Sequence, residues 1–265
     1  MFPDLFSIGP LTLHTYGLFV ATGLVVGILV AVKLGKSMGI PPQHVMDMAF
    51  VMVLSGLIGS RLAYVLMNIP YYSAHPLDMV KLWQGGLVFS GALISGVAVM
   101  IWYARSHGYT LWQMGDLWSP AAAIGQSIGR IGCFMAGCCY GKPTDHWWGV
   151  TFTDPRSIAP LHIPLHPTQL YSSFVNLIIF IVLIILSGKK RFEGQVMLWF
   201  LILHSTGRLL MERFRGDDRG MFFGTGWTMT QVLAMIILIA AIIALFILKF
   251  RSERRIPDPL NQKNT

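Results

Sequence analysis

The sequence predicts an all-α integral membrane protein with seven transmembrane helices. Of its 265 residues, 54% are hydrophobic and only 12% are charged, and the mean hydropathy is +0.59. Soluble domains are about a quarter charged, and several apolar runs in this chain reach the roughly 20 residues that a bilayer requires. Residues 1–265 are therefore expected to form a single membrane domain.

Seven apolar stretches are candidate spans. They cover about residues 13–34, 45–68, 84–104, 119–140, 169–187, 194–212 and 227–249. Residues 1–12 are amphipathic and are expected to lie at the membrane surface. No basic segment or small-residue cleavage site precedes the first span, so we expect a retained helix rather than a removed signal peptide.

The distribution of lysine and arginine predicts the orientation. These residues concentrate after the first, third, fifth and seventh spans. Because basic loops stay on the cytoplasmic side, the N-terminus is expected outside and the C-terminus inside. The longer connections, about residues 69–83, 141–168 and 213–226, then lie outside, together with the active region. The net charge of +8 is interpreted as this topology signal and not as affinity for nucleic acid.

Arginines predominate among the few ionisable residues within or at the rim of the spans. Arg61, Arg130 and Arg208 are accompanied by one carboxylate, Glu212. Such groups are costly at membrane depth unless they face a partner or a polar cavity. Ion pairing that only holds helices together is one interpretation. The excess of arginine favours an anion, and the guanidinium fork suits a phosphate such as a phospholipid head group.

The sixth span carries a polar stripe that is expected to face the bundle interior. His204, Arg208 and Glu212 follow one another at intervals of four residues, and Arg215 is predicted to continue the same helix face.

Residues 129–141 (GRIGCFMAGCCYG) contain all three cysteines. Three cysteines do not form a disulfide framework, and free, buried thiols are expected. Metal ligation through Cys133, Cys138 and Cys139 is conceivable, but no histidine lies at a close spacing. No metal or organic cofactor is therefore predicted.

Two other polar positions are weaker candidates. Tyr16 in the first span and Ser90 in the third either line the same cavity as the arginines or simply pack. Residues 166–171 (HPTQLY) are typical of a helix start, with Thr168 as a possible cap.

Short segments along nearly the whole chain resemble, in order, the prolipoprotein diacylglyceryl transferase family. Each segment alone is weakly or moderately specific, but their order on seven spans is a strong match. The segments are residues 13–17 (LHTYG), 59–66 (GSRLAYVL), 83–87 (WQGGL), 129–141, 166–171, 207–215 (GRLLMERFR) and 228–231 (TMTQ).

The resemblance implies a multi-pass enzyme of the bacterial inner membrane with its active region towards the periplasm. Members transfer the diacylglyceryl group of phosphatidylglycerol to the thiol of the lipobox cysteine in a preprolipoprotein signal peptide. The products are a thioether and glycerol phosphate, and the step begins lipoprotein maturation. The implied partners are phosphatidylglycerol, the signal peptide and the bilayer, without a cofactor. An external head region and a lateral opening for lipid are also implied.

The resemblance assigns roles to individual residues. Arg130 and Arg208 match the essential arginines of the family, Tyr16 its conserved tyrosine and Glu212 its helix glutamate. Guanidinium groups on the phosphate would stabilise the departing phosphate monoester, and their potential would favour the attacking thiolate. The candidate catalytic residues are Arg130, Arg208, His204 and Glu212. The candidate substrate-binding residues are Arg130, Tyr16, Arg61, Ser90, Arg215 and Cys133.

The sequence departs from the family pattern at three positions. Ser90 replaces a histidine that is often proposed as the base, Cys133 replaces an asparagine, and Cys138 replaces an acidic residue. His204 and Glu212 are candidate substitutes for the base, and the alternative is that the arginine field suffices.

Two other functions are considered. A divergent paralogue would use another acceptor or carry an acyl group on Cys138 or Cys139, and thiol alkylation with protection by lipid would reveal it. A transporter would line an anion path with arginines, but the sequence has no inverted repeat or matching broken helices.

Overall fold

The computed structural model describes residues 4–8, 11–81, 85–217 and 226–253. Most of these residues are helical, and two small antiparallel strand pairs accompany the helices. The chain divides into two compact units, described in turn below. The first unit consists of residues 1–30 and 115–265, and the second consists of residues 31–114.

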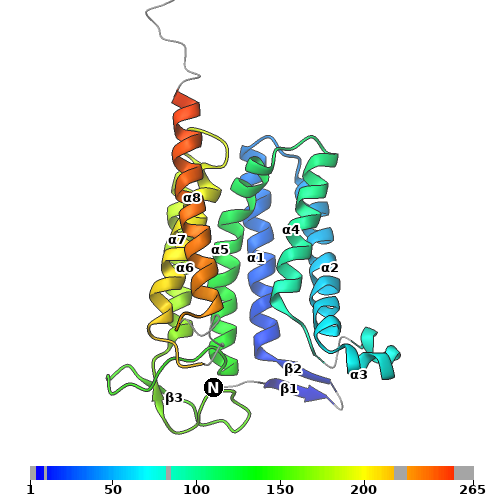
Figure 1. The fold of residues 1–265 in the computed structure, drawn as a ribbon, viewed down its shortest axis with the longest axis vertical. Coiled ribbons are helices and arrows are strands. Elements are labelled where there is room, and N and C mark those ends of the chain that lie inside the picture. The colour runs from blue at the N-terminus through cyan, green and yellow to red at the C-terminus, as the bar shows by residue number, and fades with distance from the viewer. Residues whose placement is uncertain (1–3, 9–10, 82–84, 218–225, 254–265) are drawn as a thin grey trace, which may run out of the picture. The chain divides into compact units, whose positions relative to one another are not determined.

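Seven helices of 18 residues or more overlap the seven apolar stretches (Figure 1), counted over the described part of the chain, although the fourth, predicted at about 119–140, begins at Leu111 and ends at Ala136. They are α1 (Thr15–Ser37), α2 (Pro42–Met67), α4 (Phe89–Ser106), α5 (Leu111–Ala136), α6 (Thr168–Ser187), α7 (Gln195–Glu212) and α8 (Met229–Glu253). Four of them, α1, α2, α6 and α8, have the length and apolar composition needed to cross a membrane. The protein is thus predominantly helical and carries candidate membrane spans.

Two helices begin at a capping box. The Thr110 hydroxyl accepts a hydrogen bond from the Gln113 backbone (3.1 Å), while the Gln113 side chain accepts one from the Thr110 backbone (3.2 Å). Thr228 and Gln231 form the same reciprocal pair at the start of α8, at 3.3 and 2.9 Å. Each pair satisfies two backbone N–H groups that the first helical turn leaves without partners.

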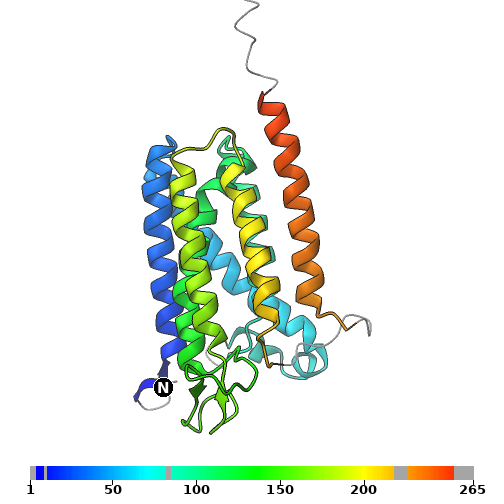
Figure 2. The ribbon, with the colours of Figure 1, turned by 90° about the vertical axis from the view of Figure 1, so that its left-hand side faces the viewer.

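In the first unit, α7 packs against both α6 and α8 (Figure 2). The buried cluster between α5, α6 and α7 consists of Ala123, Ile179, Leu183 and Val196. These apolar contacts place the polar stripe of α7 opposite neighbouring helices.

Glycines bring α1 and α5 into close contact. A Cβ atom at Gly23 would lie 2.7 Å from the carbonyl oxygen of Gly125, and one at Gly132 would lie 2.9 Å from Cβ of Phe19. Small residues at helix interfaces permit such backbone approach in membrane proteins.

A buried carboxylate fixes the turn between α6 and α7. Asp116 of α5 accepts hydrogen bonds from the backbone N–H groups of Gly194 and Met197, both at 3.0 Å, and from Lys190 Nζ at 3.2 Å. The N–H groups at the start of α7 and the lysine compensate the buried charge. Asp116 is not among the residues predicted from the sequence.

The connection between α5 and α6 is folded. Strands β3 (Val150–Thr151) and β4 (Pro164–Leu165) pair antiparallel. The buried residues beneath them are Phe152, Ala159 and Leu165.

An N-terminal hairpin is joined to this connection by ion pairs. Strands β1 (Asp4–Ile8) and β2 (Leu11–His14) pair antiparallel. Arg156 bonds to Asp4 at 3.0 Å and to Asp154 at 2.8 Å. The Arg156 guanidinium lowers the pKa of Asp154 to about 2.

In the second unit, α2 and α4 run side by side (Figure 1). Their backbones approach so closely that a Cβ atom at Gly91 would clash with the carbonyl group of Gly59. A short helix α3 (Ile69–Ala74) and a 3-10 turn (Pro76–Val80) follow α2.

The close α1–α5 contact predicts that a glycine-to-alanine substitution in α1 destabilises the protein at Gly23 but not at Gly17. Gly23→Ala should lower the free energy of unfolding by about 1–3 kcal/mol because the added methyl group overpacks the interface. Gly17→Ala is the matched control, since a Cβ there meets no atom within 4 Å. Thermal unfolding in detergent measures both variants, and equal melting temperatures would contradict the packing described here.

Candidate functional site

Four of the predicted site residues line one narrow cavity in the first unit. Arg130 comes from α5, His204 and Arg208 come from α7, and Arg215 lies just beyond α7. The other lining residues are Ser172, Val175, Asn176, Ile179, Gly207 and Met211. The cavity volume is about 20 Å³, which is enough for a water molecule but not for a lipid head group.

Arg130 is half-buried and has no hydrogen bond or ion pair with any described residue. Asn176 lines the same cavity and is 5% exposed. Its side-chain nitrogen donates to the Ser172 carbonyl at 2.7 Å, whereas its buried Oδ1 atom has no partner among the described residues. Since buried polar groups are normally satisfied, the cavity has capacity for a polar ligand.

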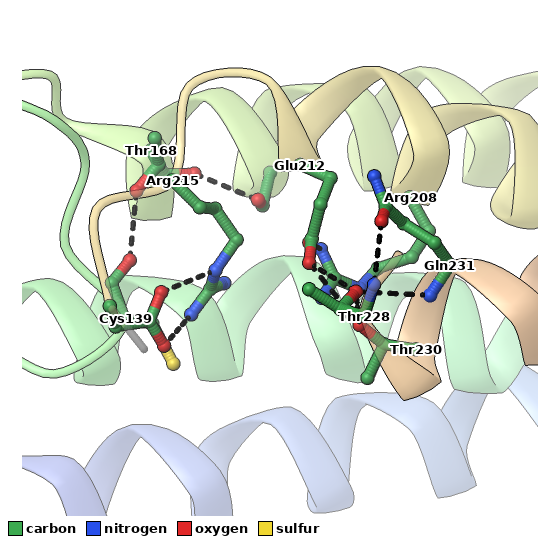
Figure 3. A network of polar contacts seen from close by, with 10 residues as sticks. Cys139, Thr168, Arg208, Glu212, Arg215, Thr228, Thr230 and Gln231 are labelled. Atoms are coloured by element: carbon green, nitrogen blue, oxygen red, sulfur yellow. Dashed lines mark hydrogen bonds and ion pairs between the residues drawn. The ribbon is translucent and has the colours of Figure 1, made fainter. Parts of the chain in front are cut away.

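Arg208 is held by a polar network between α7 and the start of α8 (Figure 3). Its Nη1 atom lies 2.5 Å from Oε2 of Glu212, and Nη2 donates to the Thr230 hydroxyl at 3.1 Å. Thr228 donates to Oε1 of Glu212 at 2.7 Å. Glu212 therefore neutralises and orients Arg208, as the ion-pairing interpretation expects for residues four apart on a helix.

Arg215 does not continue the helical stripe, so that prediction is wrong. Helix α7 ends at Glu212, and Arg215 forms a β-bridge with Gly141. Its guanidinium makes two hydrogen bonds with the carboxylate of Asp217, at 2.7 and 2.6 Å, and only 7% of Arg215 is exposed. It nevertheless reaches the cavity lined by Arg130 because the backbone turns back after α7.

The backbone pairing at this point joins three distant segments of the sequence. The Lys142 N–H group donates to the Phe214 carbonyl at 2.8 Å, and the Lys142 carbonyl accepts from the His166 N–H group at 3.0 Å. This three-segment junction contains parts of three of the quoted motifs. Its segments are residues 138–142, 166–169 and 214–216.

Side chains from the first turn of α6 complete the junction. Pro167 occupies the N-cap position, so the prediction of Thr168 as a cap is wrong. The Thr168 hydroxyl donates instead to the carbonyl of Cys139 at 2.8 Å (Figure 3). The Gln169 side-chain amide donates to the carbonyl of Cys138 at 2.9 Å. Both donors are buried, and they fix the backbone of the two cysteines.

The end of α5 brings the three cysteines together. Gly137 has φ +75° and donates to the Phe134 carbonyl at 3.3 Å, while the Cys138 N–H group donates to the Cys133 carbonyl at 3.1 Å. This is a Schellman motif, which places the side chains of Cys133 and Cys138 against each other. The sulfur atoms of Cys133, Cys138 and Cys139 lie within 4.8 Å of one another, and none of them forms a disulfide bond.

Tyr16 lies in the first turn of α1 and is 44% exposed. A Cβ atom at Gly132 of α5 would lie 3.2 Å from the Tyr16 carbonyl oxygen. Tyr16 therefore sits beside the end of α5 that carries Cys133, although it does not line the arginine cavity.

Arg61 belongs to the second unit and is 6% exposed. Its guanidinium donates to the carbonyl oxygens of Asp78 (2.6 Å), Met79 (2.9 Å), Gly85 (2.6 Å) and Gly86 (3.3 Å). Four of its five N–H groups are thus directed at backbone. In this structure Arg61 holds the segment before α4 against α2.

Ser90 also belongs to the second unit, where it is exposed in the first turn of α4. It does not line the cavity of about 370 Å³ in that unit. The residues that line this cavity are Arg61, Tyr64, Asn68, Tyr71, Tyr72, Gly85 and Gly86.

An aromatic cavity of about 460 Å³ adjoins the three-segment junction. It is lined by His146, Trp148, His166, Tyr171 and Phe214, and the His146 ring stacks on Trp148 at 4.4 Å. Burial and the neighbouring His146 lower the pKa of His166. This cavity could not be predicted from the sequence because its residues come from three separate segments.

The fold and the cavity define a helical protein with candidate membrane spans and three arginines around one cavity. A family model described as prolipoprotein diacylglyceryl transferase matches residues 3–247. The chain belongs to this family.

Curated relatives agree over nearly their whole length. A protein of Clostridium tetani is 34% identical over 253 residues, which cover 96% of this chain and 100% of the relative. A protein of Bordetella avium is 34% identical, with 96% and 97% covered, and one of Proteus mirabilis is 32% identical, with 97% and 94% covered. Each is named phosphatidylglycerol–prolipoprotein diacylglyceryl transferase.

The contacts of Arg61 predict that it stabilises the fold even when no lipid is bound. Arg61→Lys should lower the free energy of unfolding by about 2 kcal/mol, because one ammonium group cannot reach the same carbonyl oxygens and leaves buried acceptors unpaired. Thermal unfolding in lipid-free detergent tests this, with Arg105→Lys at an exposed position as the control. An Arg61→Lys protein that unfolds at the same temperature as the wild type would contradict the structural role of Arg61.

Proposed function

We propose that this protein transfers the diacylglyceryl group of phosphatidylglycerol to the lipobox cysteine thiol of a prolipoprotein, with release of glycerol phosphate. The names of its relatives supply the reaction and the two substrates. The observation that carries the proposal is Arg130, a half-buried cation without a described protein partner in the same cavity as Arg208.

The reaction forms a carbon–sulfur bond and breaks a carbon–oxygen bond at the glyceryl carbon. Negative charge grows on the departing phosphate, and donors placed on it stabilise the transition state. Arg130 is proposed to bind this phosphate directly. Arg208, oriented by Glu212, is proposed as the second cation, so that Glu212 is a positioning residue rather than the base.

His204 is proposed to take the proton of the acceptor thiol. It lines the cavity with Arg130 and Arg208, and its ring packs on Phe200 with centroids 5.4 Å apart. No described carboxylate other than that of Glu212 belongs to the Arg208 network, and Glu212 is already bonded to Arg208 and Thr228.

The cavity of about 20 Å³ must widen before a head group enters. Arg208 of the cavity is linked to α8 by a hydrogen bond to Thr230, and Glu212 by one from Thr228. We propose that lipid enters by separation of α7 and α8 at these hydrogen bonds, which are exchangeable with water or phosphate.

We further propose that all seven long helices span the bacterial inner membrane as a single membrane domain. The N-terminus would lie outside, the C-terminus inside, and the site towards the periplasm. The distribution of basic residues supports this topology. The exposed Trp147 in the folded connection before α6 supports an interfacial position of that connection.

A transfer assay tests the proposal. Purified protein is mixed with phosphatidylglycerol and a lipobox peptide, and the peptide mass is followed. Arg130→Ala should reduce the rate by about 100-fold or more, because a cationic stabiliser of the leaving group is lost. Arg105→Ala, at an exposed position, should leave the rate unchanged. A wild-type protein that yields no diacylglyceryl peptide, or an Arg130→Ala protein as fast as wild type, would contradict the proposal.

The role of His204 predicts a pH-dependent defect that imidazole relieves. His204→Ala should slow transfer by about 100-fold, and added imidazole should restore part of the rate in the vacated space. Arg130→Ala, which removes a cation instead, should not respond to imidazole. Unchanged turnover of His204→Ala from pH 6 to 8 would exclude His204 as the base.

A further inference from the structure

The three cysteines form a cluster with the dimensions of a thiolate metal site. Their sulfur atoms lie within 4.8 Å of one another. Tetrahedral zinc with Zn–S bonds of about 2.3 Å places its sulfur ligands about 3.8 Å apart. Side-chain rotations that move the sulfur atoms by an ångström or less would therefore close the cluster around one ion.

The backbone that carries these sulfurs is fixed before any ion binds. Cys133 lies on α5, and the Schellman motif directs Cys138 back towards it. Thr168 and Gln169 hold the carbonyl groups of Cys139 and Cys138. Cys139 itself has φ +61°, a left-handed conformation that a residue other than glycine seldom adopts. Strain of this kind is maintained only where the surrounding contacts impose it.

Positive charge adjoins the cluster on two sides. Arg130 precedes Cys133 by three residues on α5, and the Arg215 guanidinium bonds to the side chain of Cys139. Figure 3 shows Cys139 beside Arg215. Three thiolates and one divalent ion carry a net charge of −1. Arg130 would offset this charge, while Arg215 shares its guanidinium between Cys139 and Asp217.

We propose that Cys133, Cys138 and Cys139 bind one Zn²⁺ ion whose fourth coordination position receives the thiol of the acceptor peptide. The role of the open position rests on the proposed transferase function, whereas the three-thiolate site itself does not. Three protein ligands with an open fourth position are typical of catalytic zinc, and structural zinc is closed by four.

The proposed step is balanced without an oxidant or reductant. The three cysteine thiols release their protons to solvent when Zn²⁺ binds, and the acceptor thiol gives its proton to His204, the proposed base, when its sulfur takes the fourth position. That sulfur then attacks the glyceryl carbon with its electron pair. The carbon–oxygen bond breaks, its pair stays on the phosphate oxygen, and the thioether product leaves because it is a poorer ligand for zinc than a thiolate.

This inference departs from the expectation of no metal. The expectation rested on the lack of a histidine near the cysteines in sequence. A site of three thiolates needs no histidine, and the local fold brings Cys133 to Cys138 across the helix end.

Metal binding is measured first, independently of activity. Purified protein is stripped with a chelator and titrated with Zn²⁺ and with Co²⁺, whose thiolate charge-transfer absorption reports the ligands. We expect one ion per chain and loss of the absorption in Cys133→Ser, Cys138→Ser and Cys139→Ser. Met135→Leu, in the same helical turn, should bind as wild type does. Zn²⁺ should also protect all three wild-type thiols from alkylation, which needs no variant to fold.

Activity then separates the inference from the proposed function. Metal-free protein should lose at least 100-fold in transfer and regain it with Zn²⁺. Full transfer by protein that binds no metal, or unchanged metal binding in all three cysteine variants, would overturn the inference while the transferase function stands. A protein whose three cysteines bind metal but which transfers no diacylglyceryl group would contradict the proposed transferase function. It would also overturn the role of the open coordination position, while the metal site itself would stand.

Discussion

The hydrogen-bonded three-segment junction of residues 138–142, 166–169 and 214–216 is the constraint on which the rest of the site depends. Each of these segments leaves or enters a helix, so pairing them fixes where α5 and α7 end and where α6 begins. Arg130 and Arg208 are positioned by those helix ends, and Arg215 lies in the junction itself. The pairing thus brings Arg215, which lies beyond the end of α7, to the cavity that Arg130 of α5 and Arg208 of α7 also line.

The positive charges of the arginines in the fold are compensated in different ways. Arg61 is surrounded by carbonyl oxygens, Arg208 pairs with Glu212, and Arg215 makes two hydrogen bonds with Asp217. Arg130 has no such partner in the described part of the chain. Because an uncompensated charge at membrane depth is expensive, a ligand is the simplest explanation for it, and we propose that this ligand is the phosphate of a phospholipid, which complements the charge once the cavity widens.

The helices followed from the sequence because the length of an apolar run is a local property. The polar stripe of α7 was also predicted as far as Glu212, but Arg215 was misplaced because the helix end depends on pairing with Gly141 far away in the sequence. Thr168 has the composition of a cap, and its hydroxyl bonds instead to Cys139. The aromatic cavity and the carbonyl contacts of Arg61 depend on segments that spacing alone does not bring together. The cysteine cluster depends on the turn that ends α5, whose position the apolar pattern did not give.

We propose above that a phosphate binds between Arg130 and Arg208. An experimental structure of the wild-type protein with bound glycerol phosphate is the most direct test. We expect a widened cavity, with the phosphate oxygens within hydrogen-bonding distance of both guanidinium groups. A phosphate bound beside Arg61 instead, with Arg130 still without a partner, would contradict it.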